Sequence, residues 1–326
     1  MKKILRRNGI AALSIFCLAV AAFSAEAVAQ TYPTKPIRMI APNAPGSGTD
    51  VIGRLMGTKL SEFLGQQVVI DNRSGADGRI GMEVAARAAP DGYNLVVVTS
   101  ANAVASATFE KLTYDLNKDF SSISLLGTTP HVLIVVPSLR VTSVTELVAL
   151  AKSRPGELKY GEGSMSQRLA AEIFKYMAGC DIFNVPYKGS SAPVIGTLSG
   201  EVQLAFPSIP MVTSMIKDGK FKALGVTSAK RTPLVPDIPA ISEFVPGYSY
   251  SGWYAIVAPA KTPAAIISKL QGEVVKVLRD KTIQERLFVL GVEILASSPQ
   301  ECDKYMREEV DKMKEAVKKA GITSGS

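Results

Sequence analysis

Two short loops of glycine and small polar residues are the parts of this sequence best suited to bind a ligand. The first loop consists of Ala44, Pro45, Gly46, Ser47, Gly48, Thr49 and Asp50. It follows an apolar, strand-like run and opens onto a helix-like pattern that begins at Thr49 or Asp50, both good N-cap residues. Glycines leave the backbone amides open, and a helix N-terminus adds free N–H groups and partial positive charge. The loop therefore predicts an anion site, with an ordinary ligand-free turn as the alternative.

The second loop repeats this arrangement further along the chain. It consists of Gly161, Glu162, Gly163, Ser164, Met165 and Ser166, and it also stands between a strand-like run and a helix-like pattern. Ligands of open α/β sheets bind at the carboxyl ends of the strands, and pockets often form where two domains meet. We therefore expect two lobes, each of which presents one helix N-terminus to an anion held between them.

Three further strand ends and one arginine provide additional candidates for the site. These residues are Ser100, Asn102, Arg168, Tyr187, Lys188, Phe206, Pro207 and Ser208. The first two could supply an amide and a hydroxyl or form a simple turn, and the last three could cover the ligand. Arg168 could reach a second carboxylate, or it could be a solvated helix residue. Lys188 could bind an anion directly or be solvated.

The sequence offers no convincing catalytic or metal-binding set. His131 is the only histidine, and it stands beside an apolar run, where a histidine is usually structural. The chain lacks His/Cys/Asp/Glu clusters at metal spacing, a G-x-S-x-G elbow, a P-loop and a dinucleotide fingerprint, so we predict no catalytic residue, metal or cofactor. A secreted α/β hydrolase that uses Asp50 or Glu162 as a base stays open as an alternative, but no partner acid or nucleophile is evident.

The first 29 residues predict a cleaved secretory signal peptide and not a domain. They contain a basic start, an apolar run and an A-x-A signal, so we expect an exported, periplasmic protein. Their removal takes away four basic residues and Glu26, and the net charge falls from +8 to +5. The remaining charges form no basic stripe, which argues against nucleic acid as a partner. Cys180 and Cys302 could pair, but we expect them to be unpaired and buried.

Apolar β-type runs alternate with helical patterns along the rest of the chain, which is typical of the α/β class. The predicted strands lie at 37–41, 68–72, 94–99, 122–126, 131–136, 159–161, 183–186, 202–206, 223–226 and 254–258. The predicted helices lie at 50–64, 79–88, 144–153, 166–178, 192–199, 211–217, 263–278, 281–290 and 299–320.

A series of ordered motifs covers essentially the whole mature length. The motifs are YPTKPIRMIAPNAPGSGTD (32–50), VVIDNRSGADGRIG (68–81), APDGYNLVVVTSA (89–101), KLTYDLNKDF (111–120), VPYKGSSAPV (185–194), GKFKALGVTSAKR (219–231), PDIPAISEFVPGY (236–248), WYAIVAPAKTP (253–263) and KKAGI (318–322). With these motifs the chain resembles the substrate-binding proteins of tripartite tricarboxylate transporters, the Bug-type periplasmic receptors.

The resemblance implies a type II periplasmic-binding-protein fold, an α/β fold with the ligand cleft between two lobes. It implies a first lobe of residues 30–129 and 253–326, a second lobe of residues 130–252, and crossover strands that include Trp253. It also implies that both glycine loops hold the carboxylate, that Tyr187 and its neighbours shape the cleft, and that a membrane permease receives the solute. We expect a monomer that binds a dicarboxylate, aliphatic or aromatic; a monocarboxylate such as nicotinate or an amino acid would fit the same fold.

The second loop departs from the pattern of the family. It is about two residues shorter than the usual loop, Glu162 replaces a small polar residue, and Arg168 replaces a common histidine. A buried Glu162 would repel a carboxylate unless it faces solvent or pairs with Arg168. The sequence also leaves open a sensor role, in which the loaded protein is presented to a membrane signalling partner instead of a permease.

Overall fold

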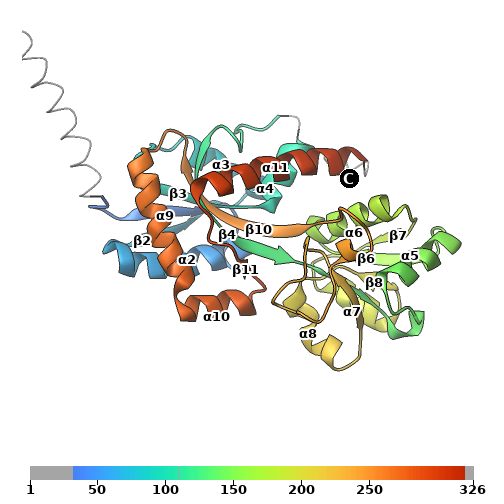
Figure 1. Cartoon of the computed structure of the whole chain (residues 1–326). Coiled ribbons are helices and arrows are strands. Elements are labelled where there is room, and N and C mark those ends of the chain that lie inside the picture. The colour runs from blue at the N-terminus through green and yellow to red at the C-terminus, as the bar shows by residue number, and fades with distance from the viewer. Residues whose placement is uncertain (1–31, 110, 320–326) are drawn as a thin grey trace, which may run out of the picture.

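Two β-sheets organise the computed structural model, which describes residues 32–109 and 111–319 (Figure 1). The predicted signal peptide and the end of the motif at 318–322 lie outside these described residues. The strands are β1 (Ile37–Ala41), β2 (Val68–Asn72), β3 (Asn94–Thr99), β4 (Phe120–Pro130), β5 (Val132–Val135), β6 (Lys159–Glu162), β7 (Phe183–Pro186), β8 (Leu204–Ala205), β9 (Lys222–Val226), β10 (Ser251–Pro259) and β11 (Glu293–Ile294).

Helices follow most of the strands, as the predicted α/β alternation requires. The α-helices are α2 (Gly48–Leu64), α3 (Arg79–Ala86), α4 (Ser100–Thr108), α5 (Val144–Ser153), α6 (Met165–Ala178), α7 (Ala192–Ser199), α8 (Ile209–Lys217), α9 (Ala264–Arg279), α10 (Lys281–Val289) and α11 (Pro299–Lys319). Short 3₁₀ turns lie at Ala76–Gly78, Pro137–Leu139 and Ile241–Glu243. Among the described residues, none of these helices has both the length and the hydropathy that crossing a membrane would need.

The six-stranded sheet has the order β11-β4-β10-β3-β1-β2, with parallel pairing among β2, β1 and β3 and antiparallel pairing at β10 and β4. Its central strands are almost continuously apolar because helices cover both faces. Buried side chains of α2 and α9 pack on one face, and those of α3, α4 and α11 pack on the other. The parallel strands place the loops after β1 and β3 at the same edge of the sheet.

The five-stranded sheet has the order β7-β6-β8-β5-β9, and β6 pairs in parallel with β7 and β8. Helices α5 and α6 share a buried cluster with one face of this sheet, while α7 and α8 contribute to the cluster on the other face. The start of α6 follows the carboxyl end of β6. The second glycine loop therefore occupies in this sheet the place that the first loop occupies in the other.

Strands β4 and β10 connect the two sheets, and Figure 1 shows both running from one body of the molecule towards the other. They pair antiparallel from Ser251↔Pro130 to Pro259↔Phe120, and His131 alone separates β4 from β5. Trp253 of β10 is buried, with its ring centroid 6.0 Å from that of Tyr305 on α11. One buried cluster includes residues of both sheets and of α11, so the connection is packed and not a loose linker.

Four predicted strands agree with the structure at both ends: 37–41, 68–72, 94–99 and 183–186. Two elements were not predicted, α4 and the short strand β11. Helix α4 consists mostly of Ala, Ser and Val without a clear apolar period, and it forms where its small residues pack beneath α11. The turn considered at Ser100–Asn102 is therefore wrong, because these residues open this helix.

The pairing of β11 with β4 gives a test of the packing at the edge of the larger sheet. A Cβ added at Gly127 of β4 would overlap the carbonyl oxygen of Glu293, which a backbone atom cannot easily avoid. We expect Gly127→Ala to lower the free energy of unfolding by about 1–3 kcal/mol, as measured by urea denaturation.

Gly272→Ala is the matched control, since the described structure has no atom within 4 Å of its added Cβ in α9. It is expected to raise the free energy of unfolding by roughly 0.5–1 kcal/mol, because alanine favours a helix interior over glycine. Equal stability of Gly127→Ala and the wild type would contradict the tight approach of β11.

Candidate ligand-binding site

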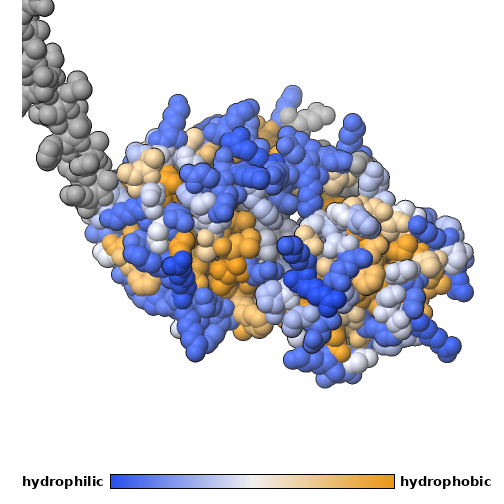
Figure 2. Space-filling model, in the orientation of Figure 1, coloured by the Kyte–Doolittle hydropathy of each residue, from blue (hydrophilic) through white to orange (hydrophobic). Residues whose placement is uncertain are grey.

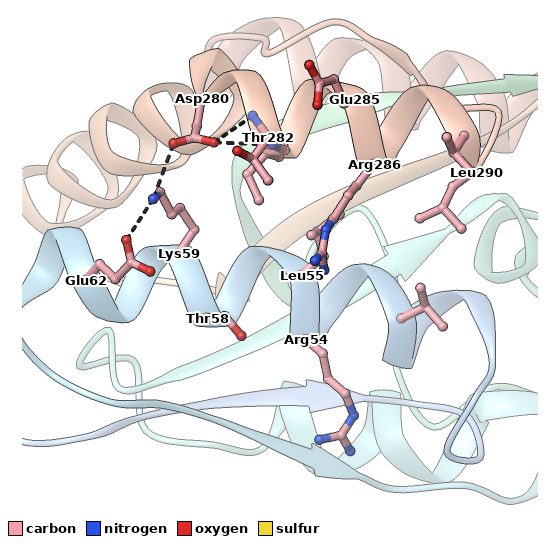
Figure 3. Close-up of a pocket in the computed structure, with 13 residues that line it drawn as sticks. Arg54, Leu55, Thr58, Lys59, Glu62, Asp280, Thr282, Glu285, Arg286 and Leu290 are labelled. Atoms are coloured by element: carbon pink, nitrogen blue, oxygen red, sulfur yellow. Dashed lines mark hydrogen bonds and ion pairs between the residues drawn. The ribbon is translucent and has the colours of Figure 1, made fainter.

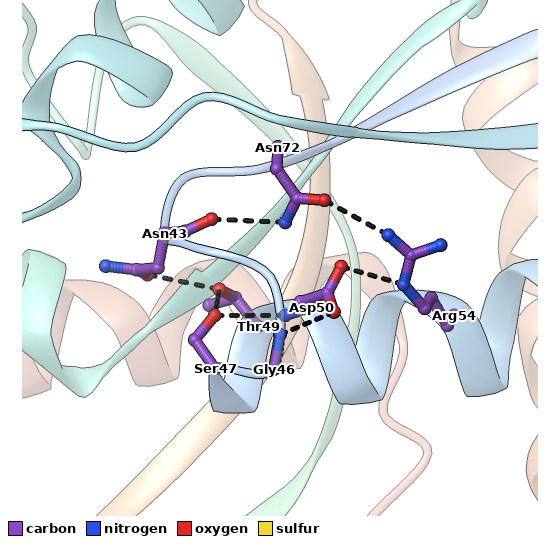
Figure 4. Close-up of polar contacts among 7 residues, drawn as sticks. All are labelled: Asn43, Gly46, Ser47, Thr49, Asp50, Arg54 and Asn72. Atoms are coloured by element: carbon purple, nitrogen blue, oxygen red, sulfur yellow. Dashed lines mark hydrogen bonds and ion pairs between the residues drawn. The ribbon is translucent and has the colours of Figure 1, made fainter.

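The first glycine loop is held in place by its own polar side chains (Figure 4). Ser47 is the N-cap of α2, and its Oγ accepts from the N–H of Asp50 at 3.4 Å. The N-cap predicted at Thr49 or Asp50 is therefore wrong, because the helix already begins at Gly48. The Thr49 hydroxyl donates to Asn43 Oδ1 at 3.1 Å, which closes the loop against the end of β1.

Asp50 is a structural anchor of this loop. Its carboxylate is only 4% exposed; it accepts from the N–H of Gly46 at 2.9 Å and forms an ion pair with Arg54 Nε at 2.9 Å. The hydrogen bond from Arg54, followed by that from Gly46, lowers the pKa of Asp50. Asn72 Oδ1 accepts from Arg54 at 3.1 Å and so holds the guanidinium in position. Asp50 Oδ1 has the ion pair but no hydrogen bond of good geometry. A charged Asp50 held by Arg54 and Gly46 is unsuited to act as a general base.

Two backbone donors of the first loop remain available. Within the described residues, the N–H groups of Gly48 and Thr49 donate to no protein acceptor. A side chain at Gly48 would overlap the hydroxyl of Tyr254, so Tyr254 would have to shift where β10 approaches the loop. Sequence reasoning missed Tyr254; its hydroxyl forms no hydrogen bond in the described structure and lies beside these amides. Only its place in the WYAIVAPAKTP motif could have drawn attention to it.

The start of α4 places Ser100 near the same strand. Ser100 Oγ lies 3.6 Å from the position that a Cβ of Gly252 would occupy. Asn102 is 4% exposed, and its Oδ1 accepts from the N–H of Thr99 at 2.8 Å. Its side chain thus caps α4 and is not presented to a ligand.

The second loop forms a capped helix start of the same kind. Ser164 is the N-cap of α6, and its Oγ accepts from the N–H of Gln167 at 3.4 Å. The amide of Gln167 accepts from Gly163 N–H at 2.8 Å and donates to Ser190 O at 2.9 Å, which ties the loop after β6 to the loop after β7. In the part of the chain that is described, the N–H groups of Met165 and Ser166 have no protein acceptor.

Ser166 joins the second loop to both connecting strands. Its Oγ lies 3.2 Å from His131 Nε2 and accepts from the Tyr250 hydroxyl at 3.2 Å. Burial lowers the pKa of His131 to about 4, so the imidazole is neutral at physiological pH. The Ser166 hydroxyl, a predicted ligand contact, is therefore engaged with the junction between the sheets, while its amide remains available.

The starts of three helices converge on one short segment of the chain, residues 250–254. Tyr254 meets Gly48 at the start of α2, Gly252 meets Ser100 at the start of α4, and Tyr250 binds Ser166 at the start of α6. Each start contributes free N–H groups and the positive end of a helix dipole. The two sheets thus place three partial positive charges along one segment of the chain, an arrangement that is suited to an extended anion.

Glu162 and Arg168 lie at the far side of the second loop. Burial raises the pKa of Glu162, while Asn184 and Arg168 favour its charged form. Arg168 forms no ion pair within the described residues, and its buried Nε has no hydrogen-bond partner. Of the two alternatives for Glu162, facing solvent or pairing with Arg168, the structure shows an electrostatic influence of Arg168 without a direct ion pair.

The remaining candidates lie around the end of the second sheet. The Tyr187 ring packs against Gly161 and Gly196, and burial raises the pKa of Tyr187 to about 12. Lys188 is exposed. Phe206 is 1% exposed and packs against Phe174, with a ring-centroid distance of 5.8 Å, so it belongs to the core.

Pro207 and Ser208 lie beside the connection between the sheets. The Pro207 carbonyl accepts from Val132 N–H at 3.0 Å, and Ser208 forms a β-bridge with His131. Ser208 is also the N-cap of α8. The described residues contain no group of three or more His, Cys, Asp or Glu side chains that could hold a metal ion.

The chain is similar to known proteins along most of its length. A sequence model described as the tripartite tricarboxylate transporter family receptor matches residues 52–322. Protein BugT of Bordetella pertussis is 32% identical over 317 residues, which cover 96% of this chain and 97% of BugT. A solved R. palustris protein with adipate is 34% identical, with a TM-score of 0.71 and coverage of 90% of this chain and 99% of that one. MatC from Rhodopseudomonas palustris, solved with bound malate, is 27% identical, with a TM-score of 0.69 and coverage of 88% and 100%.

Replacing Ser47 tests the anion site with a matched pair of variants. Asp and Asn are both good N-cap residues, so Ser47→Asp and Ser47→Asn are expected to preserve α2. The added carboxylate of Ser47→Asp would repel an anion at the amides of Gly48 and Thr49. We expect the dissociation constant for a carboxylate ligand to rise at least about tenfold, since each charge-assisted hydrogen bond contributes ~1.5–3 kcal/mol. Isothermal titration calorimetry with the neutral Ser47→Asn as the control checks this, and equal affinity of both variants would argue against the site.

The burial of His131 predicts that the stability of the fold depends on pH. Its folded-state pKa, about 4, lies below the ordinary value of 6.5, so protonation favours the unfolded chain. The contribution of neutral His131 to the free energy of unfolding is fully present above about pH 6.5. It is lost as the pH falls towards about 4, and the total loss is about 3 kcal/mol. His131→Gln should remove this part of the slope when the free energy of unfolding is measured by urea denaturation between pH 4 and 7. Identical slopes for the two proteins would contradict a buried, neutral His131.

Proposed function

Because the chain belongs to the tripartite tricarboxylate transporter receptor family, and is a solute-binding receptor and not an enzyme, we propose that it captures a small dicarboxylate and delivers it to a membrane transporter. The observation that carries the proposal is the convergence of α2, α4 and α6 on residues 250–254. The free amides of Gly48, Thr49, Met165 and Ser166 supply donors from both sheets, so one ligand can engage both.

Backbone amides explain how the site favours an anion without a cation that contacts it. Asp50, the acidic residue of the first loop, is neutralised by Arg54 and is already hydrogen-bonded. A carboxylate at the loop therefore meets N–H groups and helix dipoles with little opposing charge. A few charge-assisted hydrogen bonds of ~1.5–3 kcal/mol each, less the cost of ordering, would reach the ~8 kcal/mol of a micromolar complex.

The solved relatives support a dicarboxylate as the ligand. The R. palustris protein similar to this chain was solved with adipate, and MatC was solved with malate; both compounds carry two carboxylates. Two helix starts on one sheet and one on the other would hold the two ends of such a molecule. Binding would favour a closed arrangement of the lobes, since only that arrangement satisfies both ends at once.

We extend the proposal to the organisation of the whole chain. Residues 30–129 with 253–326 would form the first lobe and residues 130–252 the second, with the ligand between them. The signal peptide predicted at 1–29 would export the chain to the periplasm; the similar protein BugD is described as a periplasmic binding protein. The receptor would act as a monomer and pass its solute to a permease in the inner membrane.

A thermal-shift screen of the chain without residues 1–29 tests the proposal. The panel contains adipate, malate, other aliphatic and aromatic dicarboxylates, monocarboxylates, tricarboxylates and amino acids. A ligand at 100 times its Kd would stabilise the protein by about 2.7 kcal/mol, which is a clear shift in Tm. We expect a dicarboxylate to give the largest shift, to be recovered unchanged by mass spectrometry, and to lose its effect in Ser47→Asp. A shift confined to amino acids or monocarboxylates would overturn the proposed ligand class, and a chemically altered ligand would overturn the receptor function.

A further inference from the structure

A cavity of about 800 Å³ lies away from the glycine loops, between α2 and α10 (Figure 3). It is lined by Val51, Arg54, Leu55, Thr58, Lys59, Glu62, Asp280, Thr282, Ile283, Glu285, Arg286, Val289 and Leu290. We call this cavity the α2–α10 groove. The site described above does not use it, yet it begins within one turn of the ligand loop on the same helix.

Some charged side chains of the α2–α10 groove have ion-pair partners and others do not. Lys59 is paired with Glu62 at 2.7 Å and with Asp280 at 3.2 Å, which closes one end of the groove. The side chain of Arg286 forms no ion pair or hydrogen bond with any described residue, and its carbonyl accepts from the N–H of Leu290 at 3.1 Å. Figure 3 shows its guanidinium reaching towards α2 beside Leu55, whereas the Glu285 carboxylate points away from α2. An exposed positive charge without a protein partner among the described residues therefore lies beside the apolar side chains of Leu55, Val289 and Leu290.

The open end of the groove is rich in exposed apolar side chains. Val289 is 72% exposed, Phe288 55% and Leu290 43%, all at the end of α10. Figure 2 shows hydrophobic surface in this part of the molecule. Clustered apolar exposure of this kind marks surfaces that a partner covers, because water contact at several adjacent large side chains is unfavourable.

The end of α10 beside the groove lies close to α8 of the other sheet's body. A Cβ at Gly291, directly after the exposed end of α10, would be 2.7 Å from Pro210 of α8. Helix α8 packs on the five-stranded sheet, whereas α2 and α10 belong to the six-stranded one. A partner seated in the groove would therefore contact elements close to both bodies, and α2 itself starts at the amides proposed to hold the ligand.

We propose that the α2–α10 groove is the surface by which this receptor docks on its membrane transporter. The occupant is an apolar segment of the transporter that carries an acidic residue, which pairs with Arg286 while its apolar side chains cover Leu55, Val289 and Leu290. An amphipathic segment in an apolar groove is a common mode of recognition, and the charge pair sets its orientation. This inference rests on the proposed function, since it assigns a surface to the delivery step.

The test measures binding of the purified receptor to right-side-out inner-membrane vesicles from the bacterium that encodes it. Sedimentation compares the wild type with Val289→Asp/Leu290→Asp and with Arg286→Glu; protein-free vesicles of the same lipids are the second probe. We expect the wild type to bind only the native vesicles and both variants to lose at least about tenfold in affinity. Arg286→Lys, which keeps the charge, should retain most of the binding.

The matched control is Ile195→Asp/Leu198→Asp, which places the same charges on the exposed apolar face of α7. It is expected to bind as the wild type does. Equal binding by all variants, an equal loss in the α7 control, or binding of the wild type to protein-free vesicles would overturn the docking surface. The thermal-shift screen does not depend on binding to vesicles. A failure of the ligand proposal therefore appears in the thermal-shift screen, and a failure of the docking proposal appears in the sedimentation experiment. Unchanged Tm values of the variants identify a loss of binding that is not a loss of fold.

Discussion

The antiparallel pairing of β4 with β10 is the constraint on which the rest of this structure depends. The pair runs from the six-stranded sheet towards the five-stranded one. There His131 leads from β4 into β5, and Tyr250 leads back into β10. Trp253 and Tyr305 pack the pair against α11, which makes the connection a solid part of the core. Because the starts of α2, α4 and α6 all contact residues 250–254, this one connection determines where the binding groups of both sheets meet.

The candidate site draws its positive potential from the backbone and not from exposed cationic side chains. Arg54 is committed to Asp50 and Asn72, and His131 is neutral because it is buried. Amides and helix dipoles attract the carboxylate of a ligand but do not restrict the chemistry of the rest of that ligand. One fold can therefore serve receptors for different carboxylates, and the discrimination among them falls to residues such as Tyr254, Glu162 and Arg168 around the amides.

Helix α2 has two roles in this view of the molecule. Under the proposed function its N-terminus offers the amides of Gly48 and Thr49 to the ligand, while its flank forms one wall of the α2–α10 groove. Arg54 belongs to both regions, since it holds Asp50 in the loop and also lines the groove. A receptor has to present its loaded state to a transporter, and a single rigid helix that reaches from the ligand to an outer surface provides a short physical route for that.

The sequence by itself determined the α/β class, the strands of continuous apolar residues and the two glycine loops as helix starts, because these features depend on neighbouring residues. The motifs along the chain determined the family. Only the tertiary structure decided how the candidate residues are used: Asn102 is a cap, Phe206 lies in the core, and Tyr254 approaches Gly48 from a strand about two hundred residues away in the chain. Helix α4 and the α2–α10 groove also required the structure, since both arise from packing between segments that are distant in sequence and carry no local signal of their own.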